Sequence, residues 1–106
     1  MYDSRLQDHV NSIAKNLTAG FGEELNEDGQ PISGYDYLSD ALDINYIINN
    51  DRTYKGGRVL VAFGGPNIWV DTARGIVEGF WWGSYAKAEF QDNIGLDEAL
   101  EETYGY

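Results

Sequence analysis

The side chains that could act in catalysis or bind a metal are one histidine and eighteen carboxylates. A single histidine, His9, makes a poor metal site and is by itself a poor catalytic triad. The carboxylates fall in polar segments and on the outer sides of predicted helices, where nothing would raise the pKa of one of them as acid–base catalysis requires. We therefore predict no catalytic residue, no metal site and no cofactor. A hydrolase that uses two of the carboxylates is kept only as a third hypothesis.

Part of the first polar segment imitates an EF-hand calcium loop. Glu24, Asn26, Asp28 and Gly29 occupy the positions that would be 1, 3, 5 and 6 of that loop. Position 12 would require a bidentate glutamate, and Tyr35 stands there instead. The pattern is better explained by an ordinary Asp-Gly turn.

Large aromatic side chains form the second candidate for chemistry, and they are concentrated late in the chain. Trp81 points to the opposite side of its predicted strand from its neighbours, so one of these rings reaches a wet sheet face. Two alternatives remain open: Trp81 packs beneath a neighbouring loop, or Trp69 and Trp81 belong to a contact surface for a partner. The aromatic residues concerned are Trp69, Phe80, Trp81, Trp82, Tyr85 and Phe90.

Charge is segregated along the chain, whose net charge is −11. Residues 1–50 hold nine acidic and two basic residues, and residues 88–106 hold six acidic residues and no basic one. The middle of the chain is nearly neutral and strongly apolar. This pattern is explained either by solubility or by an acidic surface that meets a basic groove on another protein. Direct binding to a nucleic-acid backbone is excluded because it needs a basic footprint.

Composition sets the remaining limits. The 106 residues suffice for one domain, without a linker or repeat. Cysteine is absent, so disulfides and cysteine-based zinc sites are excluded. No apolar run is long enough for a membrane span, and the first residues lack a signal-peptide core, so we expect a cytoplasmic protein with no membrane partner.

Helices are predicted at both ends of the chain. Leu6, Val10, Ile13 and Leu17 recur at spacings of four, three and four, which predicts a helix over residues 4–19. Residues 20–34 form a polar loop, and Asp36 is expected to cap a short second helix. A weaker apolar stripe predicts a last helix near residues 93–104.

Strand-like alternation begins at residue 44. The expected strands cover residues 44–49, 58–63 with an extension over 54–57, 68–72 and 76–82, joined by short turns. Short turns require antiparallel neighbours because parallel pairing needs long crossovers. We therefore predict a single α+β domain over residues 1–106, a four-stranded antiparallel meander with N-terminal and C-terminal helices packed on one face.

Two segments of this chain, GGPNIWVDT (64–72) and VEGFWWG (77–83), resemble a core found in small acidic proteins of phages and mobile elements. The preceding segment LSDALDI (38–44) resembles the lead-in helix of the same group. The resemblance covers roughly residues 36–88. It implies a counter-defence role of the anti-CRISPR or antirestriction kind, with a Cas effector or a restriction enzyme as partner. It carries no established functional residue over to this chain.

The leading hypothesis is an inhibitor whose carboxylates stand in for phosphates in an enzyme's basic groove. The residues expected to bind the partner form a first acidic set, Glu23, Glu24, Glu27, Asp28, Asp36, Asp40 and Asp43, and a second set, Asp97, Glu98, Glu101 and Glu102. The alternative is a non-enzymatic assembly module that forms a homo-oligomer, a dimer included, or docks a partner through a sheet face around Trp69 and Trp81.

Overall fold

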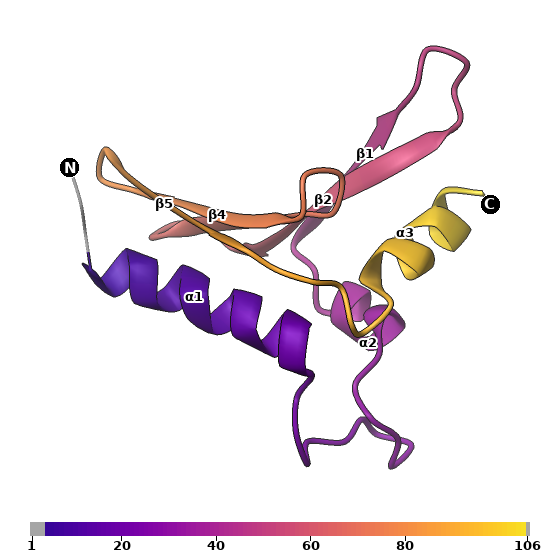
Figure 1. Cartoon of the computed structure of the whole chain (residues 1–106), viewed down its shortest axis with the longest axis horizontal. Helices are drawn as coiled ribbons and strands as arrows, with labels where there is room; N and C mark the ends of the chain where they lie inside the picture. The colour runs from indigo at the N-terminus through magenta and orange to yellow at the C-terminus, as the bar shows by residue number, and fades with distance from the viewer. Residues whose placement is uncertain (1–3, 106) are drawn as a thin grey trace.

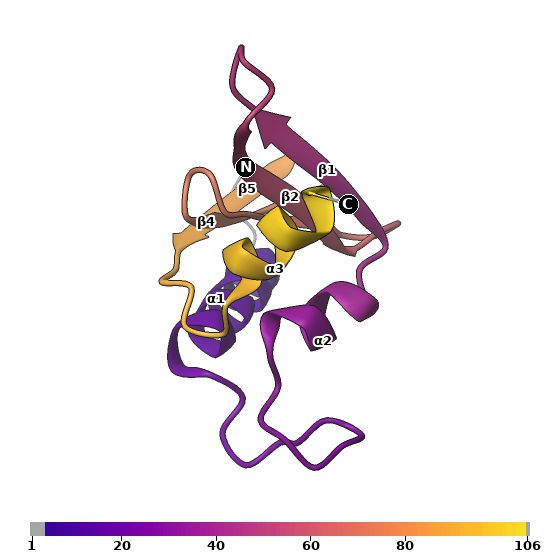
Figure 2. The ribbon, with the colours of Figure 1, turned by 90° about the vertical axis from the view of Figure 1, so that its right-hand side faces the viewer.

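Five strands form one antiparallel sheet in the computed structural model, which describes residues 4–105. Each strand pairs with the next along the chain: β1 (Asp43–Ile48), β2 (Tyr54–Ala62), β3 (Asn67–Asp71), β4 (Ile76–Trp81) and β5 (Ser84–Glu89). The helices α1 (Ser4–Ala19), α2 (Gly34–Ser39) and α3 (Leu96–Tyr104) lie on one side of this sheet (Figures 1 and 2). The α+β class and the antiparallel meander are confirmed, whereas the expected number of four strands is wrong.

The core lies between the helices and one face of the sheet. The predicted stripe of α1 places Leu6, Val10 and Leu17 in it, all but fully buried. Val59, Val70 and Val77 face them from three adjacent strands and are paired with one another in register. Apolar residues of α3 complete the same cluster. We call the opposite side of the sheet, which no helix of the described residues covers, the open face.

Close packing of α1 explains the glycine within the VEGFWWG segment. A Cβ added to Gly79 would come within 2.8 Å of Leu6 Cδ1 and within 2.9 Å of Val10 Cγ2. Any larger residue would therefore force the helix away from β4.

The fifth strand was missed because its apolar residues are small. The fourth strand, predicted over residues 76–82, ends at Trp81, and a tight turn follows in which Trp82 and Gly83 have φ of 52° and 76°. Two positive φ values in a two-residue turn fit the right-handed twist of the strands on either side. In β5, Ala86 and Ala88 face α1, and polar residues alternate with them. Alanine and lysine are poor strand formers, so this alternation carried little signal.

Helix boundaries differ from expectation where two residues compete as caps. The N-cap of α2 is Ser33, and Asp36 is the third helical residue, which completes a capping box with Ser33. The prediction of Asp36 as the N-cap is therefore wrong. Serine and aspartate are both common N-cap residues, so the sequence alone does not show at which of the two the helix begins. In the last helix, left-handed Gly95 precedes the first turn, so α3 begins at Leu96 rather than near residue 93.

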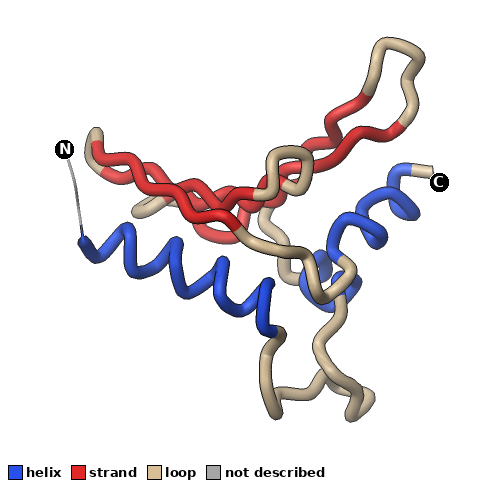
Figure 3. The backbone as a smooth tube through the Cα atoms, viewed as in Figure 1, coloured by secondary structure: helices blue, strands red, loops and turns tan. Residues whose placement is uncertain are grey.

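Connections between the strands are short, whereas a long loop joins α1 to α2 (Figure 3). Among the described residues, no helix combines the length and apolar character that crossing a membrane would require.

Candidate functional site

The loop between α1 and α2 is folded by a neutral side chain rather than by its acids. Asn26 Oδ1 accepts hydrogen bonds from the backbone N–H groups of Asp28 and Gln30, both at 2.9 Å. Asn26 Nδ2 donates to Asp36 Oδ2 at 3.1 Å. The carboxylates of Glu27 and Asp28 take no part in this arrangement and remain exposed.

Asp36 is the one acid of this region with a defined role in the fold. Its Oδ2 accepts hydrogen bonds from the backbone N–H of Ser33 at 2.8 Å and from the Ser33 hydroxyl at 3.0 Å. The hydrogen bond from the Ser33 backbone, followed by that from the Asn26 side chain, lowers the pKa of Asp36 below its ordinary value. Asp36 is therefore held as a carboxylate at neutral pH.

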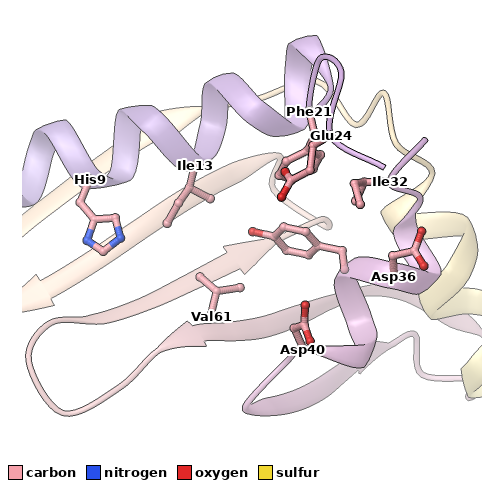
Figure 4. A pocket seen from close by; sticks show the side chains of 9 residues that line it. His9, Ile13, Phe21, Glu24, Ile32, Asp36, Asp40 and Val61 are labelled. Atoms are coloured by element: carbon pink, nitrogen blue, oxygen red, sulfur yellow. The ribbon is translucent and has the colours of Figure 1, made fainter. Parts of the chain in front are cut away.

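Two adjoining pockets lie beside this loop and α2, and the first of them also reaches α1 and β2. The first, of about 360 Å³, is lined by His9, Ile13, Phe21, Glu24, Ile32, Asp36, Tyr37, Asp40 and Val61 (Figure 4). The second, of about 500 Å³, shares Ile32, Asp36 and Asp40 with it and adds Leu25, Asn26, Glu27, Asp28 and Ser39. We call the five carboxylates around these pockets the acidic rim: Glu24, Glu27, Asp28, Asp36 and Asp40.

The second predicted acidic set lies on α3 and adjoins the first. Tyr35 of α2 donates a hydrogen bond from its hydroxyl to Glu102 of α3, which connects the two helices. Glu98 and Glu101 are exposed on the same helix. Asp97 is half-buried, and its Oδ1 accepts a hydrogen bond from the Tyr54 hydroxyl at 2.7 Å. Burial, reinforced by that bond to Asp97, raises the pKa of Tyr54.

Two of the predicted partner-binding acids lie outside both the acidic rim and α3. Glu23 is exposed on the loop, but its side chain lines neither of the two pockets. Asp43 lies at the start of β1, opposite Leu60, and therefore on the open face of the sheet. The structure thus gathers five of the predicted acids into the rim, brings α3 beside it through Glu102, and separates Asp43 from both.

Charges on the open face are arranged in the opposite way. Glu78 Oε1 accepts from Arg58 Nη2 at 3.0 Å and from Arg74 Nη2 at 2.5 Å, and Glu78 Oε2 accepts from the Tyr85 hydroxyl at 2.9 Å. Asp71 Oδ2 accepts from Arg74 Nε at 2.8 Å. Asp71 and Glu78 are 2% and 5% exposed, so two arginines shield two carboxylates from water. We call Arg58, Asp71, Arg74, Glu78 and Tyr85 the paired network.

Trp69 and Trp81 lie on opposite faces of the sheet, which corrects the prediction of a single surface containing both. Trp69 is paired with Glu78 and faces the open side, where the Arg58 guanidinium carbon lies 4.6 Å from the ring centroid. Trp81 is three residues beyond Glu78, so it points toward α1 and packs against the core. The Arg5 guanidinium carbon lies 4.9 Å from the Trp81 ring centroid.

Other aromatic residues are exposed at the end of the sheet where the turns after β2 and β4 lie. Trp82 is 87% exposed and Phe63 is 74% exposed. Phe80 and Tyr85 are about half as exposed as Trp82, and their ring centroids lie 5.1 Å apart. We call Phe63, Phe80, Trp82 and Tyr85 the aromatic tip. A pocket of about 260 Å³ separates the Phe63 turn from the Trp82 turn.

Sequence reasoning missed the apolar residues of the first rim pocket. Ile13, Phe21, Tyr37 and Val61 come from α1, the loop, α2 and β2, and no spacing rule connects them. Burial raises the pKa of Tyr37 to about 12, so its hydroxyl stays protonated at neutral pH. The paired network did leave a signal, because Arg58, Asp71 and Glu78 interrupt otherwise apolar strands.

Comparison with known proteins gives this site no precedent: no protein-family model, curated protein or solved structure matches the chain. Within residues 4–105, no group of three or more histidine, aspartate or glutamate side chains is placed to hold a metal ion. The chemistry of the site must therefore be inferred from its own charges and surfaces.

Proposed function

We propose that this chain is a non-enzymatic inhibitor that binds a nucleic-acid-processing enzyme and occupies its basic groove. The resemblance to phage proteins points to a counter-defence role in the cytoplasm of a host cell, against a Cas effector or a restriction enzyme. The inhibitor itself binds no nucleic acid, because its net charge of −11 opposes a phosphate backbone.

The observation that carries this proposal is the unpaired state of the acidic side chains on the helix side. The four ion pairs within residues 4–105 all involve Asp71 or Glu78, on the open face. Eight exposed carboxylates of the loop, α2 and α3 have no ion pair with a lysine, arginine or histidine of this part of the chain: Glu23, Glu24, Glu27, Asp28, Asp40, Glu98, Glu101 and Glu102.

Such carboxylates suit a phosphate-binding groove. Arginine and lysine side chains that bind phosphate also form charge-assisted hydrogen bonds with carboxylates. The electrostatic attraction acts between charges that are exposed to solvent before the proteins bind. Salt therefore screens it, which weakens binding and slows association. Competition with DNA and steep salt dependence are therefore the expected signatures.

The experiment that tests the proposal is a DNA-cleavage assay with a panel of Cas effectors and restriction enzymes. The wild-type chain is compared with Glu27→Lys/Asp28→Lys on the acidic rim. A matched control, Asp8→Lys/Glu89→Lys, makes the same change in net charge on α1 and β5. We expect inhibition of at least one enzyme, relieved by excess DNA, and a rim variant at least about tenfold weaker than the control.

Equal loss of inhibition in both variants would show that only overall charge matters, and equal retention would contradict charge mimicry. Absence of inhibition across the whole panel would overturn the assignment to these enzyme classes. Each variant is first checked by its unfolding transition, so that loss of folding is not read as loss of binding.

The aromatic tip favours a second candidate, a module that docks a partner or a second copy through apolar contact. Trp82 is 87% exposed, which leaves a large apolar ring in water. It also has a positive φ, a backbone conformation that bulky residues rarely adopt. Binding through this tip would persist at high salt, since desolvated aromatic contacts are not screened. Trp82→Ala would abolish such binding, while the rim variant would not change it.

A further inference from the structure

The first rim pocket combines an apolar floor with a charged edge. Four segments supply its apolar surface: α1 with Ile13, the loop with Phe21 and Ile32, α2 with Tyr37 and β2 with Val61. The ring centroids of Phe21 and Tyr37 lie 6.1 Å apart at a tilt of 42°. Figure 4 shows Phe21, Ile32 and Asp36 at one end of the pocket and His9 at the other. A long side chain with an apolar stem would find contact along this floor.

The edge of the pocket selects for positive charge. Glu24, Asp36 and Asp40 contribute carboxylates, and Asp36 is held ionised by its lowered pKa. Within residues 4–105, Glu24 and Asp40 make no ion pair with a basic side chain. His9 is the only other titratable group of the lining besides the Tyr37 phenol, which burial keeps neutral. The pocket therefore offers carboxylates that lack a cation.

We propose that this pocket receives an arginine side chain from the basic surface of the inhibited enzyme. The inference rests on the proposed function and names the contact that anchors it. Arginine fits the lining better than lysine does, because a planar guanidinium stacks on an aromatic face while it donates to carboxylates. A lysine ammonium is more strongly hydrated and offers no planar face.

The charge of the pocket decides against the other occupants of a small cavity. An anion or a nucleic-acid phosphate would meet three carboxylates. A wholly apolar ligand would leave Glu24 and Asp40 without a counter-charge. A cation on an apolar stem satisfies both parts of the lining at once.

The test uses isolated amino-acid probes, so that it does not depend on the enzyme. The full chain labelled with ¹⁵N is titrated with N-acetyl-arginine amide, with the lysine equivalent, and with N-acetyl-citrulline amide, which has the shape of arginine without its charge. We expect saturable shifts at residues of the pocket, with a dissociation constant on the order of 1–10 mM for arginine. Lysine should bind more weakly, and citrulline at least about tenfold more weakly.

Matched variants separate the pocket from general acidity. Glu24→Gln/Asp40→Asn should weaken arginine binding by about tenfold, whereas Asp8→Asn/Glu89→Gln, with the same change in charge on α1 and β5, should leave it unchanged. Shifts that do not saturate, that are equal for citrulline, or that fall equally on α3 would overturn the inference.

The two proposals fail separately. Arginine binding without inhibition of any enzyme would sustain the pocket and remove the proposed function. Inhibition that survives Glu24→Gln/Asp40→Asn in full would remove the anchor and leave charge mimicry through the other carboxylates.

Discussion

The paired network on the open face and the acidic rim on the helix side use carboxylates in opposite ways. On the open face, Asp71 and Glu78 are buried and each meets arginine, and Tyr85 adds a hydroxyl. On the helix side, the exposed acids of the rim and of α3 meet no basic side chain within residues 4–105. The same residue types thus stabilise the sheet on one side and remain available on the other.

The difference shows which acids the fold requires. When a buried ion pair loses either its carboxylate or its arginine, the remaining charge keeps a desolvation penalty that no opposite charge offsets. An exposed carboxylate keeps its water, so replacing it changes the free energy of unfolding little. Stability and binding should therefore respond to different substitutions.

The largest effect is expected from Glu78→Gln, which removes the charge of the paired network and keeps its shape. Arg58 and Arg74 would then face an amide in place of the carboxylate that they share. We expect a loss of about 3 kcal/mol in the free energy of unfolding, at the low end for a broken buried pair because both arginines keep some contact with solvent. Urea unfolding measures it.

The control for that experiment is Glu101→Gln, an exposed acid of α3. Its free energy of unfolding should stay within about 0.5 kcal/mol of the wild type. A loss below about 0.5 kcal/mol for Glu78→Gln as well would remove the distinction between the two sides.

A smaller effect is expected at alkaline pH from Tyr37, the neutral group within the acidic side. Its pKa is raised to about 12 by burial, so the folded state favours the protonated phenol. That contribution to stability is complete below the ordinary pKa of 10.0 and is lost as the pH rises from there through about 12. Wild type should lose about 1–2 kcal/mol through this group over that interval, and Tyr37→Phe should lack this part of the decline.

Absorbance at 295 nm provides an independent check, because it follows tyrosine ionisation directly. The tyrosine signal missing from Tyr37→Phe should be one that titrates late in the wild type. A missing signal near the ordinary tyrosine pKa would show that the hydroxyl is in contact with water.

The sequence predicted the elements better than it predicted what they bring together. The stripe from Leu6 to Leu17 determined α1 and its buried face, because helical periodicity is local. The strand Ser84–Glu89 escaped because Ala86 and Ala88 carry a weak apolar signal, although they suffice to pack beneath α1.

The composition of each surface depends on the pairing register of the strands, which the local sequence pattern does not reveal. Trp69 pairs with Glu78, and this pairing alone puts Trp69 and Trp81 on opposite faces. The turn between β3 and β4 sets that register, and a shift by one residue would have reversed the result. The first rim pocket likewise depends on how α1, the loop, α2 and β2 meet in space.

The smallest effect on stability is expected where the largest effect on binding is proposed. Glu27→Lys/Asp28→Lys should leave the free energy of unfolding within about 0.5 kcal/mol of the wild type, because these exposed carboxylates hold no part of the loop. Asn26 holds it, through hydrogen bonds to two backbone N–H groups and to Asp36. Urea unfolding at low and high salt measures the change, and added salt should stabilise the more negative wild type more than the variant.

Asn26→Ala sharpens this last comparison, since it removes no charge. It should destabilise the loop by about 1–2 kcal/mol because its hydrogen bonds are lost, while every carboxylate of the rim is still present in the chain. Hydrogen exchange at Asp28 and Gln30 should then accelerate in Asn26→Ala and stay slow in Glu27→Lys/Asp28→Lys. If the charge-reversed variant opened the loop instead, the rim acids would be part of the fold, and the two sides of the molecule would differ only in exposure.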